Sequence, residues 1–90
     1  MEFVILRIVK ARLNRLDRAL DTYLIGIIQA AMAQIEARGI HLREDDPADV
    51  MLASDLAVWR YQNRDDRGDY PAWLDKELRD RWIQEARHDS

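Results

Sequence analysis

Apolar residues recur at intervals of three and four along most of this 90-residue chain, as in helices that bury one side. The clearest such segment covers residues 46–61, DPADVMLASDLAVWRY. Asp46 suits a helix N-cap, and Pro47 suits the first helical position. Two adjoining apolar stripes follow and extend to Tyr61, a wider apolar face than one neighbouring helix would cover. We therefore predict a central helix here, with Trp59 in the core and the other segments packed around it.

Three further segments carry a helical pattern. Residues 3–13 place apolar groups on one side, although their β-branched residues would also suit a strand. Residues 16–38 form the longest periodic stretch, and Gly39 suits a left-handed helix end after it. The last helix is expected to begin near Pro71. The pattern predicts an all-α fold in one domain over residues 1–90, a small bundle of about four helices. These are a short N-terminal helix, a long second helix, the central third helix and a C-terminal helix.

Narrower expectations concern single residues within these helices. Gly26 lies inside the second helix, where glycine costs about 1 kcal/mol relative to alanine, so we expect another helix to approach it closely. Ser54 is expected to bond back to a carbonyl of its own helix. The chain from Glu85 onward is expected to fray. A mixed-charge outer face is predicted for the last helix, made of Glu77, Arg79, Asp80, Arg81 and Glu85.

Composition narrows the classes of protein that need to be considered. The net charge is −3, with 14 Lys and Arg against 17 Asp and Glu, whereas a nucleic-acid-binding protein usually shows a basic balance or face. Hydrophobic content of 48% excludes a disordered chain. Without cysteine there is no disulfide or thiol chemistry. No run approaches about 18 apolar residues, so neither a transmembrane helix nor a membrane partner is expected.

The sequence lacks the residue patterns that are typical of catalytic, cofactor-binding and metal sites. His41 and His88 do not lie at helical spacing from a second ligand, and no Gly-rich phosphate loop is present. Ser54 has no base near it in the pattern. Residues 65–69, DDRGD, are loosely similar to a calcium loop but lack its alternating ligands and terminal Glu, which favours a solvated turn. We therefore predict no catalytic, cofactor-binding or metal residue, and not an enzyme.

Apolar residues that one small core cannot hold indicate self-association. Two tryptophans of the last helix lie nine positions apart and so point about 180° apart. At least one of them is expected at an edge or an interface, where tryptophan is enriched. Residues 3–6 are four consecutive apolar residues, which cover every side of a helix. The predicted interface residues are Phe3, Val4, Ile5, Trp73 and Trp82.

The segments at the ends of the predicted helices, taken in order, resemble those of a known protein family. The first helix ends in KARLN at residues 10–14, and the second ends in IEARGI at residues 35–40. LAVWRYQNR at residues 56–64 ends the third, and YPAWLDKELRDRW at residues 70–82 opens the fourth. This arrangement resembles the head–tail connector proteins, also called adaptor or head-completion proteins, of long-tailed phages and prophages. The turn at residues 14–17 is shorter than in many such proteins, so the first two helices could also run on as one.

The resemblance implies a structural role without catalytic residues or a cofactor. Such proteins assemble as a homo-oligomeric ring below the portal protein, contact a tail or stopper protein, and form part of the DNA channel. The implied location is the virion, or the host cytoplasm during assembly. DNA would pass without sequence-specific binding, and the acidic balance of the chain suits this, because phosphates would be repelled.

A different class of function remains open at this point, a small helical regulatory module that binds DNA or protein. On a continuous helix, Arg7, Arg15 and Arg18 would share a face and could meet phosphates. The competing interpretation is a solvated face that pairs with Asp17, Asp21 and neighbouring subunits. The segment 16–38 is also too long for a helix of a helix-turn-helix unit. The cationic cluster in question consists of Arg7, Lys10, Arg12, Arg15 and Arg18.

Overall fold

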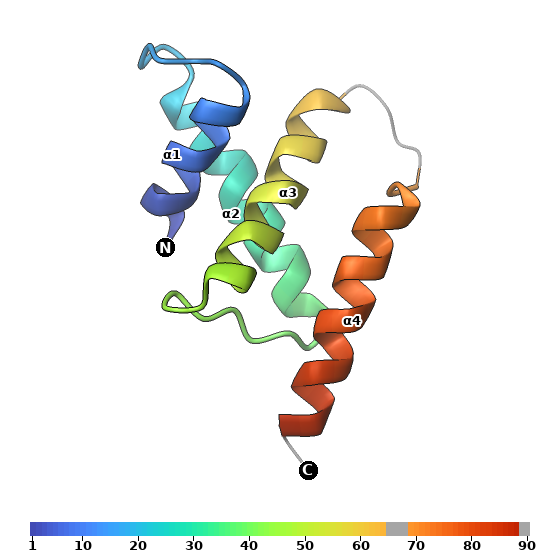
Figure 1. Ribbon diagram of the computed structural model, residues 1–90. Helices are drawn as coiled ribbons and strands as arrows, with labels where there is room; N and C mark the ends of the chain where they lie inside the picture. Colours follow the sequence, from blue (N-terminus) through green and yellow to red (C-terminus); the bar gives the residue numbers. More distant parts are fainter. Residues whose placement is uncertain (65–68, 89–90) are drawn as a thin grey trace.

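A computed structural model describes residues 1–64 and 69–88. Within these ranges the fold is all-helical, as predicted, and four helices follow one another along the chain (Figure 1). They are α1 (Glu2–Arg12), α2 (Asp21–Ala37), α3 (Pro47–Gln62) and α4 (Ala72–His88). None of these helices is both long enough and apolar enough to cross a membrane.

Helix α3 is the centre of the bundle, which confirms the prediction for residues 46–61. It packs against each of the other three helices, and α1 and α2 also pack against each other. In Figure 1, α1 and α4 flank α3 on either side, while α2 crosses behind it. Helix α4 therefore lies at the edge of the bundle and is attached chiefly through α3.

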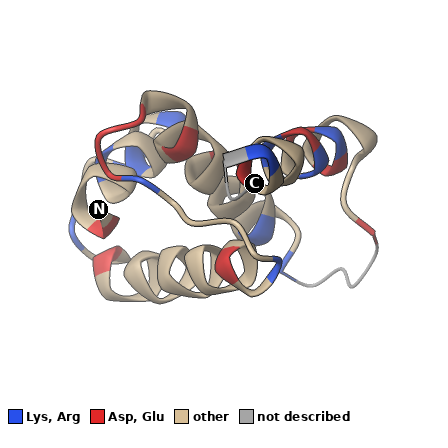
Figure 2. Cartoon of the chain, turned by 90° about the horizontal axis from the view of Figure 1, so that it is seen from below, with Lys and Arg blue, Asp and Glu red and all other residues tan. Residues whose placement is uncertain are grey.

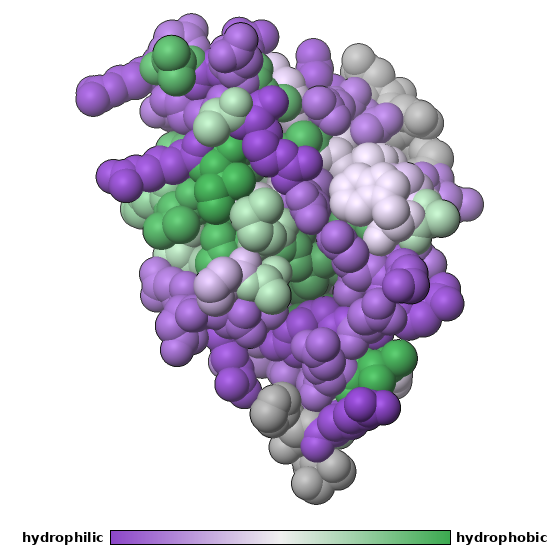
Figure 3. Space-filling view, viewed as in Figure 1, coloured by the Kyte–Doolittle hydropathy of each residue, from purple (hydrophilic) through white to green (hydrophobic). Residues whose placement is uncertain are grey.

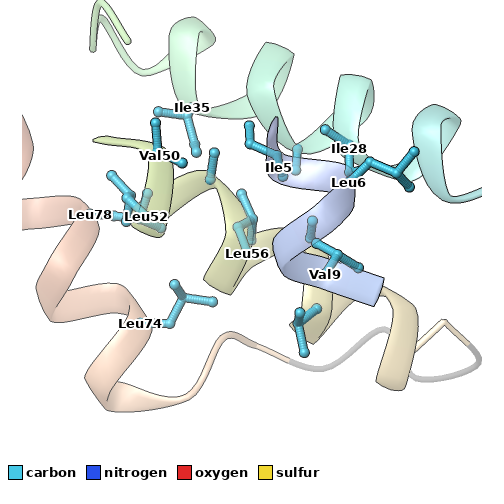
Figure 4. Packing of buried hydrophobic residues seen from close by; sticks show 14 of the residues in the cluster. Ile5, Leu6, Val9, Ile28, Ile35, Val50, Leu52, Leu56, Leu74 and Leu78 are labelled. Carbon is cyan, nitrogen blue, oxygen red and sulfur yellow. The ribbon is translucent and has the colours of Figure 1, made fainter. Parts of the chain in front are cut away.

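The hydrophobic core surrounds α3 on the sides that face its neighbours. Leu56 and Ala53 of α3 are fully buried, and α1, α2 and α4 each contribute fully buried side chains against them (Figure 4). Burying one such aliphatic side chain contributes about 1.5–3 kcal/mol. The core comprises Ile5, Leu6, Val9, Leu24, Ile28, Ala31, Ile35, Ile40, Val50, Leu52, Ala53, Leu56, Ala57, Val58, Leu74 and Leu78.

The helix ends of α3, α2 and α4 follow the local chemistry that the sequence indicated. The side chain of Asp46 accepts the amide of Ala48 at 2.9 Å, and Pro47 opens α3. Gly39 follows α2 with a φ of 89°, a left-handed conformation that glycine adopts without strain. Pro71 directly precedes α4, and its carbonyl accepts the amides of Leu74 and Asp75 in the first turn of that helix.

The start of α2 differs from the prediction. The helix begins at Asp21 rather than at residue 16, and a linker over residues 13–20 separates it from α1. Asn14 adopts a φ of 57°, which turns the chain out of the helical path and excludes one continuous helix. Leu16 is 87% exposed instead of lying on the apolar side of α2. A break at Asn14 was a plausible interpretation of the sequence, but the apolar spacing from Leu16 onward placed the start of α2 too early.

Two other expectations were wrong, one was correct, and one lies outside the described residues. A side chain at Gly26 would meet nothing within 4 Å, so no helix approaches it closely and the packing gives no reason for glycine there. Helix α4 continues past Glu85 to His88 instead of fraying there, and residues 89–90, which the same expectation covered, lie outside the described ranges. Ser54 donates to the carbonyl of Val50 at 2.8 Å, as predicted. The calcium-like run at residues 65–69 falls almost wholly outside the described ranges.

Candidate interaction surfaces

Large apolar side chains are exposed on several sides of the bundle. Figure 3 shows one such side, where hydrophobic groups gather over α1 and the adjoining part of α3. Ile5 was predicted at an interface, and that placement is wrong because the side chain is fully buried in the core. The other four predicted interface residues are all about half exposed or more. The exposed large hydrophobic residues are Phe3, Val4, Leu16, Tyr23, Met51, Trp73, Trp82 and Ile83.

The exposed aromatic residues of α4 follow from the face that its leucines occupy. Leu74 and Leu78 are buried and hold the side of α4 that faces the bundle. Trp73 and Trp82 lie on either side of this stripe and are 49% and 50% exposed. The indole of Trp82 lies near the end of α2, since a side chain at Gly39 would come within 3.7 Å of its Nε1. Both tryptophans therefore present a large apolar area to solvent.

Aromatic side chains connect α2 and α3 with the chain that leads into α4. Trp59 is only partly buried, so the prediction that it fills the core is corrected: it lies at the core margin. Its ring meets Tyr70 edge-on at a centroid distance of 4.9 Å. Tyr61 meets Tyr23 at 6.3 Å, and the guanidinium of Arg64 lies 4.7 Å from the Tyr61 ring. The two ring pairs contribute about 0.5–1.5 kcal/mol each beyond the buried area.

A cluster of charged side chains holds α4 against the start of α3, and we name it the Asp49 cluster (Asp49, Arg81 and Glu85). Asp49 is fully buried, and its Oδ1 accepts Nε of Arg81 at 2.6 Å. Arg81 also donates to Glu85 Oε2 at 3.1 Å and to the carbonyl of His41 at 2.9 Å. Glu85 Oε1 accepts the amide of His41 at 2.7 Å, and Asp49 Oδ2 accepts the amide of Arg43 at 2.9 Å. The cluster thus joins α3, α4 and the connection before α3.

The protonation equilibria of the Asp49 cluster follow from these contacts. Burial acts to raise the pKa of Asp49, but hydrogen bonds from Arg81 and from the Arg43 amide outweigh it, so the pKa is lowered. The His41 amide and then Arg81 lower the pKa of Glu85. The hydrogen bond to Asp49 raises the pKa of Arg81. All three groups are therefore charged at neutral pH, and Arg81 interacts with both carboxylates.

Sequence reasoning missed this cluster by assigning Arg81 and Glu85 to the outer face of α4. A signal was available, since positions 74, 78, 81 and 85 are spaced by four, three and four and share one face of a helix. Arg81 and Glu85 are charged, so a search for apolar residues at helical spacing follows this face only as far as Leu78.

A groove lies between α3 and α4 on the side of α4 that carries carboxylates, and we name it the acidic groove. It encloses about 320 Å³. Lysine and arginine partially balance its charge: Arg12 of α1 forms an ion pair with Asp55, and Lys76 lies 3.6 Å from Asp80. Burial, and then the neighbouring Asp55, raise the pKa of Glu77. We name its apolar lining residues Ala48, Met51 and Leu52 the floor, and its acidic lining residues Asp55, Glu77 and Asp80 the rim.

The cations of the N-terminal region, which the sequence suggested as one cluster, do not form a single cluster in the structure. Lys10 pairs with Asp21 at 2.8 Å, and Arg12 pairs with Asp55. Arg15 and Arg18 lie exposed in the linker, off any helix. In the view of Figure 2, basic and acidic segments are interspersed along the helices. The continuous basic helix face that a DNA-binding module would need is not formed by these residues.

Nothing in the described ranges groups three or more His, Cys, Asp or Glu side chains so that they could hold a metal ion. The features that distinguish the molecule are thus surfaces: the exposed tryptophans of α4, the exposed N-terminal residues of α1, the linker and the acidic groove. The chain matches no family model, and no curated protein or solved structure was found to be similar to it.

Proposed function

We propose that this protein is a structural subunit of a phage or prophage head–tail connector. Copies of the chain would form a ring under the portal protein, contact a tail or stopper protein, and line part of the channel through which DNA passes. The observation that carries this proposal is the exposure of large apolar side chains on separate sides of a small bundle. A subunit of a ring needs such surfaces on at least two sides, because it contacts a neighbour on each.

The location of the exposed residues supports contacts with other chains rather than a small ligand. Trp73 and Trp82 lie half exposed on a helix at the edge of the bundle, where a partner can reach them. Tryptophan is also among the residues that contribute most to protein interfaces. The helical order and the segments KARLN, IEARGI and YPAWLDKELRDRW add the resemblance to connector proteins.

The alternative of a DNA-binding module has weaker support. Lys10 and Arg12 are already engaged by carboxylates of α2 and α3. The net charge of −3 also disfavours retention of DNA, which fits a channel through which DNA slides.

Deletion of the gene from the phage or prophage genome that carries it tests the proposal. We expect DNA-filled heads and separate tails in place of tailed particles, with tailed particles restored by the wild-type gene. A Trp73→Ser, Trp82→Ser variant should fail to restore them, whereas Arg79→Ser, a substitution on the exposed surface of the same helix, should succeed. Tailed particles in normal numbers after deletion would refute the proposal.

A further inference from the structure

We infer that the acidic groove of one copy binds the linker between α1 and α2 of a second copy. Leu16 of the second copy would rest on the apolar floor, and its Arg15 and Arg18 would face the acidic rim. This inference rests on the proposed function, because it specifies the contact by which copies join.

The linker carries an exposed apolar group, Leu16, between Arg15 and the neighbouring Asp17 and Arg18, so its cations exceed its carboxylates by one. Leu16 is 87% exposed, more than any other large hydrophobic residue in the described ranges. Asn14, with its φ of 57°, turns the chain so that the linker leaves the end of α1 (Figure 1). Arg15 and Arg18 are also exposed, and neither forms an ion pair with residues 1–64 or 69–88. Such a segment is adapted to a partner that is apolar and acidic.

The acidic groove offers that combination of apolar and acidic groups. Met51 is 44% exposed on the floor although the surrounding core is closed. The volume of about 320 Å³ is at the lower end of the range of ligand pockets, about 300–1,000 Å³, which suits one short segment. The floor is formed by Ala48, Met51 and Leu52 and the rim by Asp55, Glu77 and Asp80.

The charges around the groove leave an excess of one carboxylate. Asp55 is paired with Arg12 of α1, and Asp80 with Lys76. Arg81 also lines the groove, but its guanidinium is engaged by Asp49 and Glu85.

Glu77 has no cation within ion-pair distance in the ranges described. Burial, and then Asp55, raise its pKa, and the charge of Arg12 acts in the opposite direction without outweighing them. An arginine from a second copy would compensate the excess negative charge.

The contact is of the head-to-tail type, because the linker and the acidic groove are different parts of the surface. Figure 1 shows the linker on the side of the bundle away from α4, whereas α4 forms one wall of the groove. After two copies join, the pair therefore still has one free linker, on one copy, and one free groove, on the other. Repetition of such a contact gives a ring if the rotation closes.

Mixing two variants tests this arrangement. The linker variant carries Arg15→Ser, Leu16→Ser and Arg18→Ser, and the groove variant carries Glu77→Lys. Sedimentation velocity from micromolar to millimolar concentration should show self-association of the wild type, and each variant alone should associate about tenfold more weakly, a change of about 1.4 kcal/mol. Their mixture should form a one-to-one dimer and nothing larger, because only one intact linker and one intact groove remain. Arg7→Ser, which removes another exposed arginine, should associate like the wild type.

Cross-linking locates the contact without relying on affinity. The chain has no cysteine, so Leu16→Cys and Asp80→Cys can be introduced into separate copies. A short bifunctional reagent should join these two copies, and should join Leu16→Cys to the control Arg79→Cys at least tenfold less. Circular dichroism should show that every variant retains the helical content of the wild type.

Three outcomes would overturn the inference: a wild type that stays monomeric at every concentration, linkage between two Leu16→Cys copies alone, or oligomers that neither variant weakens. If oligomers form and neither variant weakens them, the proposed connector role still stands. If deletion of the gene leaves normal tailed particles, the connector role fails, whatever the cross-links show.

Discussion

The helices α1, α2 and α3 are joined in a different way from α4. Fully buried aliphatic side chains from all three meet at the centre of the bundle. Helix α4 contributes only Leu74 and Leu78 to that core, and its second half is attached by the Asp49 cluster. Apolar packing depends on shape and buried area, whereas the charged contacts depend on every partner being present. The attachment of α4 is therefore more specific and more easily lost than the packing of the other three helices.

A substitution at the centre of the apolar region should have the largest effect. Leu56→Ala removes a fully buried side chain from α3, and we expect it to lower the free energy of unfolding by about 2–5 kcal/mol. Urea denaturation measures this. Met51→Ala, at a partly exposed position of the same helix in the lining of the acidic groove, should lower it by about 0.5 kcal/mol or less. Equal losses for both would mean that α3 is not the centre of the core.

The second-largest loss in the free energy of unfolding is expected from removal of Arg81, which joins the charged groups of the Asp49 cluster. Arg81→Ala leaves the carboxylate of Asp49 buried without compensation, and we expect a loss of about 3 kcal/mol. Arg79→Ala, which breaks an exposed pair with Asp75, should cost about 0.5 kcal/mol or less.

Amide hydrogen exchange of the Arg81→Ala variant should show lost protection in α4 before α2. Uniform loss across all helices would contradict a separate attachment of α4.

Low pH should weaken the attachment of α4, because it protonates the carboxylates of Asp49 and Glu85. Folding lowers the pKa of Asp49 below its ordinary value of 3.8 and that of Glu85 below 4.5. As the pH falls, the unfolded chain takes up these protons first, so the stabilisation is complete above about pH 5 and is lost progressively below it.

The urea midpoint of the wild type should therefore fall more steeply in this range than that of Arg81→Ala, in which much of the stabilisation is already absent. Parallel curves for the two proteins would show that the Asp49 cluster does not contribute.

The smallest expected effect has the opposite sign. Glu77→Gln removes a carboxylate whose pKa is raised, so ionised Glu77 disfavours the folded state. At neutral pH the variant should be more stable by about 0.5 kcal/mol or less, and the difference should vanish below pH 4.5, the ordinary pKa of the group. Thermal unfolding at both pH values checks this. A variant that is less stable at neutral pH would contradict the charge balance assigned to the acidic groove.

The contrast between the two attachments also explains what the sequence could predict. Helical periodicity indicated four helices and placed residues 46–61 at the centre, because α3 has apolar residues on more than one side. Helix ends with distinct chemistry, such as Asp46 and Gly39, were predicted correctly. The start of α2 was not, because the apolar spacing of Leu16 continues through a turn at Asn14.

The interaction surfaces were only partly accessible to the same reasoning. Trp73 and Trp82 stood out because two large side chains nine residues apart cannot share one face. Ile5 was misplaced, since four consecutive apolar residues do not reveal which one faces inward. Arg81 was misassigned because a charged residue on an inner face cannot be told from a solvated one until its partner, Asp49, is located in space.

Electron cryomicroscopy of the particles made by the genome that carries this gene tests the proposed role most directly. We predict a closed ring of copies of this four-helix fold between the head vertex and the tail, with Leu16 and the tryptophans of α4 covered by neighbouring chains. Tailed particles that lack the protein, or that contain it with these side chains facing solvent, would contradict that prediction.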